Sequence, residues 1–143
     1  MLKKAIESGA ILPIIIILAT ILNFRSFLYS FNLSWFEVGV SVIYLAIWII
    51  TLKSSWKNKK YNLIFISSIF WITTFTLSSM LVHIRMNNAD IDLPLLLVLL
   101  LITPLFGLEF LINHRYIIYI VISVISFVFS AFGTFSLITK RKK

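Results

Sequence analysis

Hydrophobic residues occur in five long runs, and the polar residues between them form only short connections. A helix needs about 20 apolar residues to cross the hydrocarbon core of a bilayer. Inside lipid such a run must be helical, because each unsatisfied backbone group costs several kcal/mol there. The pattern predicts an all-α, polytopic integral membrane helical bundle, a single transmembrane domain over residues 1–143 with no soluble domain. The five expected helices cover residues 5–24, 34–52, 61–84, 93–112 and 116–138.

Composition narrows the class of protein. The chain has 143 residues, of which 60% are hydrophobic and 13% charged, whereas soluble domains have about 45–50% and about 25%. A soluble enzyme, a nucleic-acid-binding domain and a disulfide-stabilised secreted protein are therefore excluded. The net charge of +8 comes from basic residues at the ends of the apolar runs. Residues placed there predict contact with the lipid bilayer and its anionic lipids, and no direct contact with nucleic acid.

The orientation depends on the fourth run. If all five runs cross with the N-terminus inside, seven basic residues lie inside and six outside, which gives no bias. If the fourth run instead enters the membrane and returns to the same side, ten basic residues lie inside and three outside, with both termini cytoplasmic. Pro94, Pro104, Gly107 and Glu109 are residues expected in a broken helix. Four crossings, five crossings, and insertion in both orientations all remain open from the sequence.

Ionisable residues inside a membrane are candidates for function because they are costly to bury. Three are candidates here: Glu109, His83 and Glu37. Glu109 follows Pro104 and Gly107, so it could gate an ion or proton or form an ion pair between helices. Glu37 completes a Ser-x-x-Glu capping box with Ser34, which explains it without any function.

Small and hydroxyl-bearing residues predict where helices pack. Ser123, Ser126, Ser130 and Thr134 form a seam for helix packing or oligomer contact along the last expected helix. The third expected helix carries a similar polar stripe, which favours interhelical hydrogen bonding or, alternatively, the border of a water-filled path. Both helices should therefore face protein.

Two basic clusters flank the apolar runs. They predict contact with anionic lipid or with an acidic partner at a membrane face. Their members are Lys57, Lys59, Lys60, Lys140, Arg141, Lys142 and Lys143.

No motif for catalysis, metal binding or cofactor binding is found, and the chain lacks cysteine. We expect no catalytic residue, no metal and no cofactor. The sequence favours a small non-catalytic membrane subunit that anchors, senses for or regulates a larger complex. Heavy use of Ile, Phe, Asn, Lys and Tyr is typical of AT-rich genes, which suggests a bacterial inner membrane and a defence or immunity system. The alternatives are a homo-oligomeric ion channel or small-solute transporter and, behind it, an intramembrane enzyme.

Overall fold

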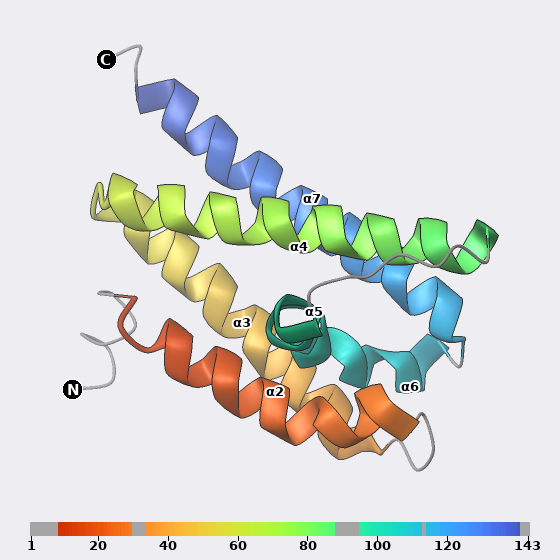
Figure 1. Cartoon of the computed structure of the whole chain (residues 1–143). Helices are drawn as coiled ribbons and strands as arrows, with labels where there is room; N and C mark the ends of the chain where they lie inside the picture. The colour runs from red at the N-terminus through yellow and green to blue at the C-terminus, as the bar shows by residue number, and fades with distance from the viewer. Residues whose placement is uncertain (1–8, 30–33, 88–94, 113, 141–143) are drawn as a thin grey trace.

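The computed structural model describes residues 9–29, 34–87, 95–112 and 114–140, and these residues form helices and no strand. Figure 1 shows the arrangement of the helices. In chain order they are α2 (Leu12–Tyr29), α3 (Trp35–Lys57), α4 (Tyr61–Asn87), α5 (Leu95–Ile102), the 3₁₀ helix η1 (Thr103–Leu108), α6 (Glu109–Ile112) and α7 (Arg115–Lys140).

The distribution of polar side chains is the reverse of that in a soluble protein. On α3 the exposed face carries Val42, Ile43 and Ile49, while Ser41 and Thr51 are fully buried. On α4 the exposed face is again apolar and the buried face includes serine and threonine. An apolar outer surface around a partly polar interior is what lipid as solvent requires. The chain is an integral membrane protein with a helical-bundle fold.

Helices α4 and α7 form a long antiparallel pair. The hydroxyl oxygens of Ser79 and Ser123 are 2.9 Å apart, and the rings of Trp71 and Phe129 stack at 4.4 Å. One further contact lies nearer the other end of the pair, where Gly133 closely approaches the side chain of Ser68. Residue numbers fall along α4 as they rise along α7. The last turn of α4 therefore lies level with the first turn of α7.

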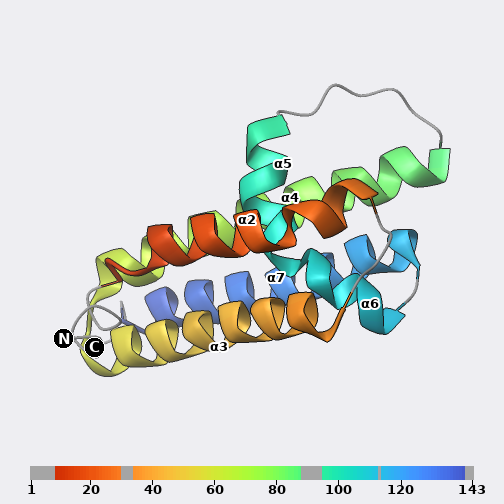
Figure 2. The same ribbon diagram turned by 90° about the horizontal axis from the view of Figure 1, so that it is seen from below.

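The chain between α4 and α7 consequently makes no net crossing. Figure 2 shows α2, α3, α4 and α7 running along the bundle, whereas α5 stands across them and α6 leads back to the end where α7 begins. Length and composition alone qualify Leu95–Ile112 as a span, but its geometry is that of a segment that enters the bundle and returns. We call Leu95–Ile112 the re-entrant segment.

By length and composition α3, α4 and α7 can each cross a membrane, whereas the apolar stretch of α2, Leu12–Arg25, is shorter. Because the re-entrant segment returns, we expect α2 to be the fourth crossing. Helix α2 has 18 residues, a length of about 27 Å at about 1.5 Å per residue, close to the thickness of a bilayer core. Gly9, just before α2, packs against Leu63 in the first turn of α4. The start of α2 therefore lies at the same end of the bundle as the start of α4 and the end of α7. Of the described basic residues, five lie at that end (Lys53, Lys57, Lys59, Lys60 and Lys140), and Arg25, Arg85 and Arg115 belong to segments at the other. This distribution agrees with the positive-inside rule if the first end faces the cytoplasm.

Several helices extend past their expected ends. Helix α3 continues through Lys53 to Lys57, because long lysine side chains keep their stems on apolar surface and place the charge in water. Helix α2 ends at Tyr29 and α4 at Asn87. The fourth expected helix is not continuous, since η1 interrupts it. Residues 5–8, 93 and 94 of the expected ranges lie outside the described residues.

The four-crossing topology can be tested by labelling single cysteines, since the chain has none of its own. Asn58 lies after α3, Asn87 ends α4 and His114 precedes α7. We expect a membrane-impermeant thiol reagent to label Asn87→Cys and His114→Cys from one side of the membrane, and Asn58→Cys only from the other. Labelling of Asn87→Cys and His114→Cys from opposite sides would show five crossings.

Candidate functional site

The centre of the molecule is the break in the re-entrant segment. Every residue from Leu101 to Glu109 is buried, and η1 packs mainly against α2 and α3. The break follows from Pro104, which has no N–H and whose ring clashes with the preceding turn of an α-helix. Backbone that is not α-helical is tolerated at membrane depth only where protein or water covers it. Here α2 and α3 provide that cover.

Two side chains from other helices bind the backbone at the break. The Nδ2 amide of Asn23 donates to the carbonyl oxygen of Pro104 at 2.8 Å and to Oγ of Ser41 at 2.9 Å. The hydroxyl of Ser41 donates to the same carbonyl at 2.9 Å. The side chains of Asn23 and Ser41 are both fully buried. These three residues, the central polar cluster, link α2, α3 and η1 by hydrogen bonds at the break.

A glycine allows η1 to lie directly on α3. A Cβ at position 107 would collide with the backbone carbonyl of Glu37 and lie 2.7 Å from Oγ of Ser41. Because a carbonyl within a helix cannot move aside as a side chain can, Gly107 is required for this close approach. The same contact holds the N-terminal turn of α3 against the re-entrant segment.

The buried faces of α3 and α4 carry a second group of polar atoms. The rings of Trp48 and Trp71 meet edge to face at 5.3 Å, and Thr51 and Ser67 lie one turn nearer the α3–α4 turn on their respective helices. Most buried hydroxyls bond to their own helix, as Ser55 does to the carbonyl of Thr51 at 2.7 Å. The buried atoms of the described residues that have no hydrogen-bond partner include Oγ1 of Thr51, Oγ of Ser67, Nε1 of Trp71, Oγ1 of Thr103 and Oγ of Ser126. We call these five residues the interior polar row.

Burying a polar atom without a partner is unfavourable by about 1–3 kcal/mol. Native proteins rarely keep such atoms unless water or an ion satisfies them. A water molecule that reached any residue of the interior polar row would therefore gain a hydrogen bond there. The row is contributed by α3, α4, η1 and α7.

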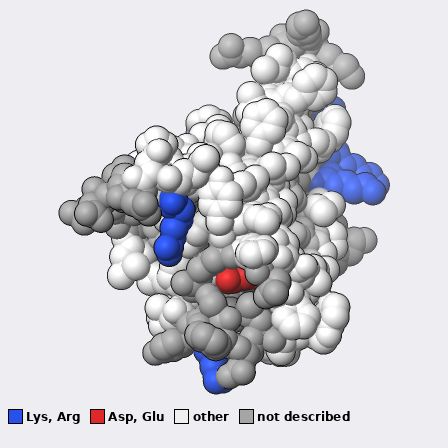
Figure 3. Space-filling model, turned by 90° about the vertical axis from the view of Figure 1, so that its right-hand side faces the viewer, with Lys and Arg blue, Asp and Glu red and all other residues white. Residues whose placement is uncertain are grey.

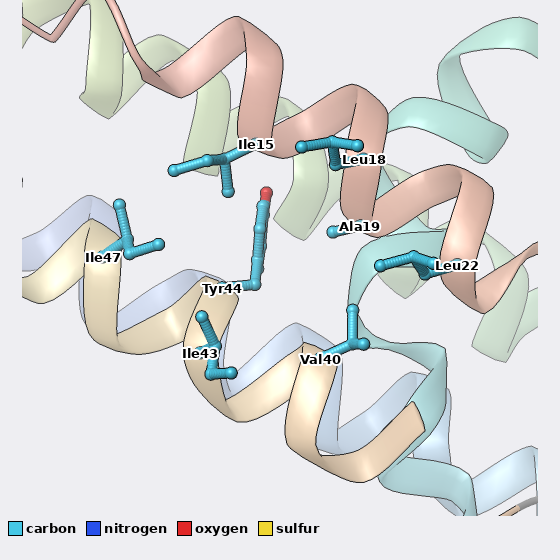
Figure 4. Close-up of a pocket in the computed structure, with 8 residues that line it drawn as sticks. All are labelled: Ile15, Leu18, Ala19, Leu22, Val40, Ile43, Tyr44 and Ile47. Carbon is cyan, nitrogen blue, oxygen red and sulfur yellow. The ribbon is translucent and has the colours of Figure 1, made fainter. Parts of the chain in front are cut away.

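A small apolar cavity lies between α2 and α3, and Tyr44 is one of the residues that line it. It has a volume of about 190 Å³ and is lined by Ile15, Ala19 and Val40, among others. The Tyr44 side chain points from α3 toward α2, with its hydroxyl between the two helices (Figure 4). Tyr44 is 1% exposed, so this hydroxyl extends the polar character of the buried face of α3 toward α2.

The predicted ionisable candidates lie toward one end of the bundle. The predicted capping box of Ser34 and Glu37 is confirmed. The Glu37 carboxylate accepts a hydrogen bond from the backbone N–H of Ser34 at 2.9 Å and contacts the Ser34 hydroxyl. Glu109 starts α6 and is 5% exposed. His83 is exposed on α4, with Nδ2 of Asn87 3.0 Å from its ring Nδ1. Figure 3 shows this end as mostly uncharged, with one small acidic spot and separate basic side chains.

These three side chains do not form a metal centre. Within the described part of the chain, no three His, Asp or Glu side chains lie close enough to hold a metal ion. Glu109 follows Gly107 by two residues, and Gly107 lies against the backbone of Glu37.

The predicted seam on α7 partly faces α4. Ser123 contacts Ser79, Ser126 is fully buried, and Ser130 donates to the carbonyl of its own helix at Phe127. Thr134 is exposed, and its neighbour Gly133 makes the close approach to α4 instead. A role for this seam in oligomer formation stays a prediction.

The basic residues lie at the opposite end, around the turn between α3 and α4. Lys57 ends α3, and Lys59 and Lys60 form a Schellman-type turn, in which the N–H of Lys60 donates to the carbonyl of Ser55 at 2.8 Å. Lys59 has a positive φ of 55°, a conformation that glycine adopts without cost. Lys140 ends α7, and Arg141, Lys142 and Lys143 lie outside the described residues.

Comparison with known protein families, with curated proteins and with solved structures found no match. The functional argument therefore depends on the geometry of the chain itself. Within that geometry, Asn23, Ser41 and Thr51 are central residues that the sequence analysis did not single out. Their signal in the sequence is weak: one amide within an apolar run, and hydroxyls at helical spacing on α3.

Replacing glycine with alanine tests the packing of η1 on α3. Gly107→Ala should lower the free energy of unfolding by about 1–3 kcal/mol, because the added methyl group meets a helix carbonyl. Gly39→Ala, where a Cβ meets nothing within 4 Å, is the matched control and should leave stability unchanged or raise it by up to about 1 kcal/mol. Thermal unfolding in mild detergent measures both. Equal stability of the two variants would contradict the close approach.

Lys59→Gly should stabilise the turn between α3 and α4. A side chain at positive φ costs about 1–2 kcal/mol that glycine avoids. Lys60→Gly removes the same charge at a position without positive φ and serves as the control. Chemical denaturation of the two variants should show a gain for Lys59→Gly alone. A gain of the same size for Lys60→Gly would attribute the effect to charge.

Proposed function

We propose that the protein is a small, non-catalytic ion channel or small-solute transporter of the bacterial cytoplasmic membrane. The observation that carries the proposal is the re-entrant segment, whose broken, fully buried centre lies inside a bundle of four crossings. Broken helices at membrane depth are a common way for transporters and channels to place backbone groups beside a permeating species. With the basic end in the cytoplasm, both termini are cytoplasmic.

In this proposal the interior polar row lines the path of the permeating ion or solute. Hydroxyls on α3, α4 and α7 and Thr103 of η1 face the interior and have no partner among the described residues. Water entering the bundle would hydrogen-bond with these atoms and would carry a small ion or solute with it. The central polar cluster binds η1 to α2 and α3, and in this proposal the arrangement is that of a closed state. Opening would require η1 to move relative to α3.

A non-catalytic subunit of a larger complex is the second candidate, and the distribution of charge favours it. One membrane face carries most of the basic residues, including the exposed Lys57, Lys59 and Lys60. Such a face fits an acidic cytosolic partner as well as anionic lipid. A role in defence or immunity belongs to this candidate and is supported by composition alone.

Flux across proteoliposomes tests the transport proposal. The double variant Thr51→Val and Ser67→Ala removes two hydroxyls of the interior polar row with little change of volume. We expect ion or solute flux to fall about tenfold or more, since losing these contacts to permeating water costs about 1–3 kcal/mol. Thr73→Val is the control, because its hydroxyl bonds to the carbonyl of Ile69 on its own helix.

Two outcomes would contradict the proposal. One is unchanged flux in a double variant that folds like the wild type. The other is wild-type flux no greater than that of empty liposomes, together with recovery of a stoichiometric protein partner from native membranes. The second outcome would support the subunit.

A further inference from the structure

An apolar groove runs between α3 and α7 at the basic end of the bundle. It has a volume of about 550 Å³. Trp56 meets Phe132 edge to face at 5.2 Å, which links the two helices across it. Phe129, which also lines the groove, is supported from behind by its stacking on Trp71. The complete lining is Ile49, Leu52, Lys53, Trp56, Val128, Phe129 and Phe132.

Lys53 is the charged residue of this lining, and its place near the end of α3 puts a lysine beside apolar walls. Lys53 and Lys57 are one turn apart on α3, so they share a face of the helix. Both are exposed and both lie in the last two turns of α3, at the level where a membrane helix meets the headgroups. Ile49 lies one turn deeper. The groove therefore presents cationic side chains at headgroup level and apolar walls below it.

We propose that this groove binds one anionic phospholipid of the cytoplasmic leaflet. The phosphate would lie against Lys53 and Lys57, and an acyl chain would lie along Leu52, Phe129 and Phe132. Basic sites between membrane helices on the cytoplasmic side suit anionic headgroups, and aromatic residues such as Trp56 favour the interface. The inference does not depend on the transport proposal.

Among the described residues, charge complementarity favours lipid over a second copy of the chain. The acids in the described residues are Glu37 and Glu109. Glu37 lies 16 residues before Lys53 on the same helix, a distance of about 24 Å along the axis. Glu109 lies on the re-entrant segment beside the Glu37 end of α3. A second copy in the same orientation would thus bring neither of these carboxylates to Lys53, whereas a phosphate in the cytoplasmic leaflet is at the right depth.

Quenching of tryptophan fluorescence by brominated lipids tests the site. The full-length chain is placed in nanodiscs of phosphatidylcholine that contain increasing amounts of brominated phosphatidylglycerol or brominated phosphatidylcholine. The fluorescence that is lost in the Trp56→Phe variant is the contribution of Trp56, which lines the groove. We expect this part to be half-quenched at a several-fold lower mole fraction of brominated phosphatidylglycerol than of brominated phosphatidylcholine.

Substitution of single lysines supplies the control. Lys53→Gln should reduce the preference for phosphatidylglycerol about fivefold, the effect of one lysine charge near an anionic headgroup. Lys60→Gln removes the same charge from the same end, but outside the groove, and should keep the preference. Equal quenching by both lipids, or equal loss in the two variants, would overturn the proposal. Failure of either lipid to quench the Trp56 signal would also overturn it and would indicate a protein in the groove, such as a second copy.

Discussion

The carbonyl oxygen of Pro104 is the point on which the interior of the bundle depends. A membrane protein cannot leave backbone groups unpaired in a region that lacks water. The proline breaks the helix, and Asn23 and Ser41 hydrogen-bond with the carbonyl at the break. One amide side chain thereby joins two helices to a segment 81 residues further along the chain. The close packing at Gly107 belongs to the same arrangement, because η1 must lie against α3 for Ser41 to reach the carbonyl.

Much of this architecture could be predicted from the sequence, because lipid imposes simple rules. The five apolar runs follow from the length needed to cross a bilayer, and the capping box at Ser34 follows from local chemistry. The return of the fourth run was one of the alternatives indicated by charge counting, and the pairing of α4 with α7 favours it. The contact between Ser79 and Ser123 agrees with the prediction that both helices face protein.

The candidate site was harder to predict than the fold. Asn23 lies within an apolar run, and only the three-dimensional structure brings it to Pro104. The buried positions Ser41 and Thr51 share a face of α3, but a stripe of hydroxyls in a membrane helix has two meanings. Such hydroxyls can bond to their own helix, as Ser55 does, or face a shared interior without a partner, as Thr51 does. The sequence does not contain that difference, which depends on rotamers and neighbours.

The antiparallel pairing of α4 and α7 also has a consequence for biosynthesis. The re-entrant segment is apolar enough to be inserted as a crossing when it first leaves the ribosome. At that stage α7 has not left the ribosome, and nothing yet fixes the start of α7 at the end where α4 finishes. We therefore expect the final topology to be set when α7 pairs with α4, because this pairing leaves the segment before α7 no route to the far side. The path of the re-entrant segment then depends on a helix that follows it in the chain.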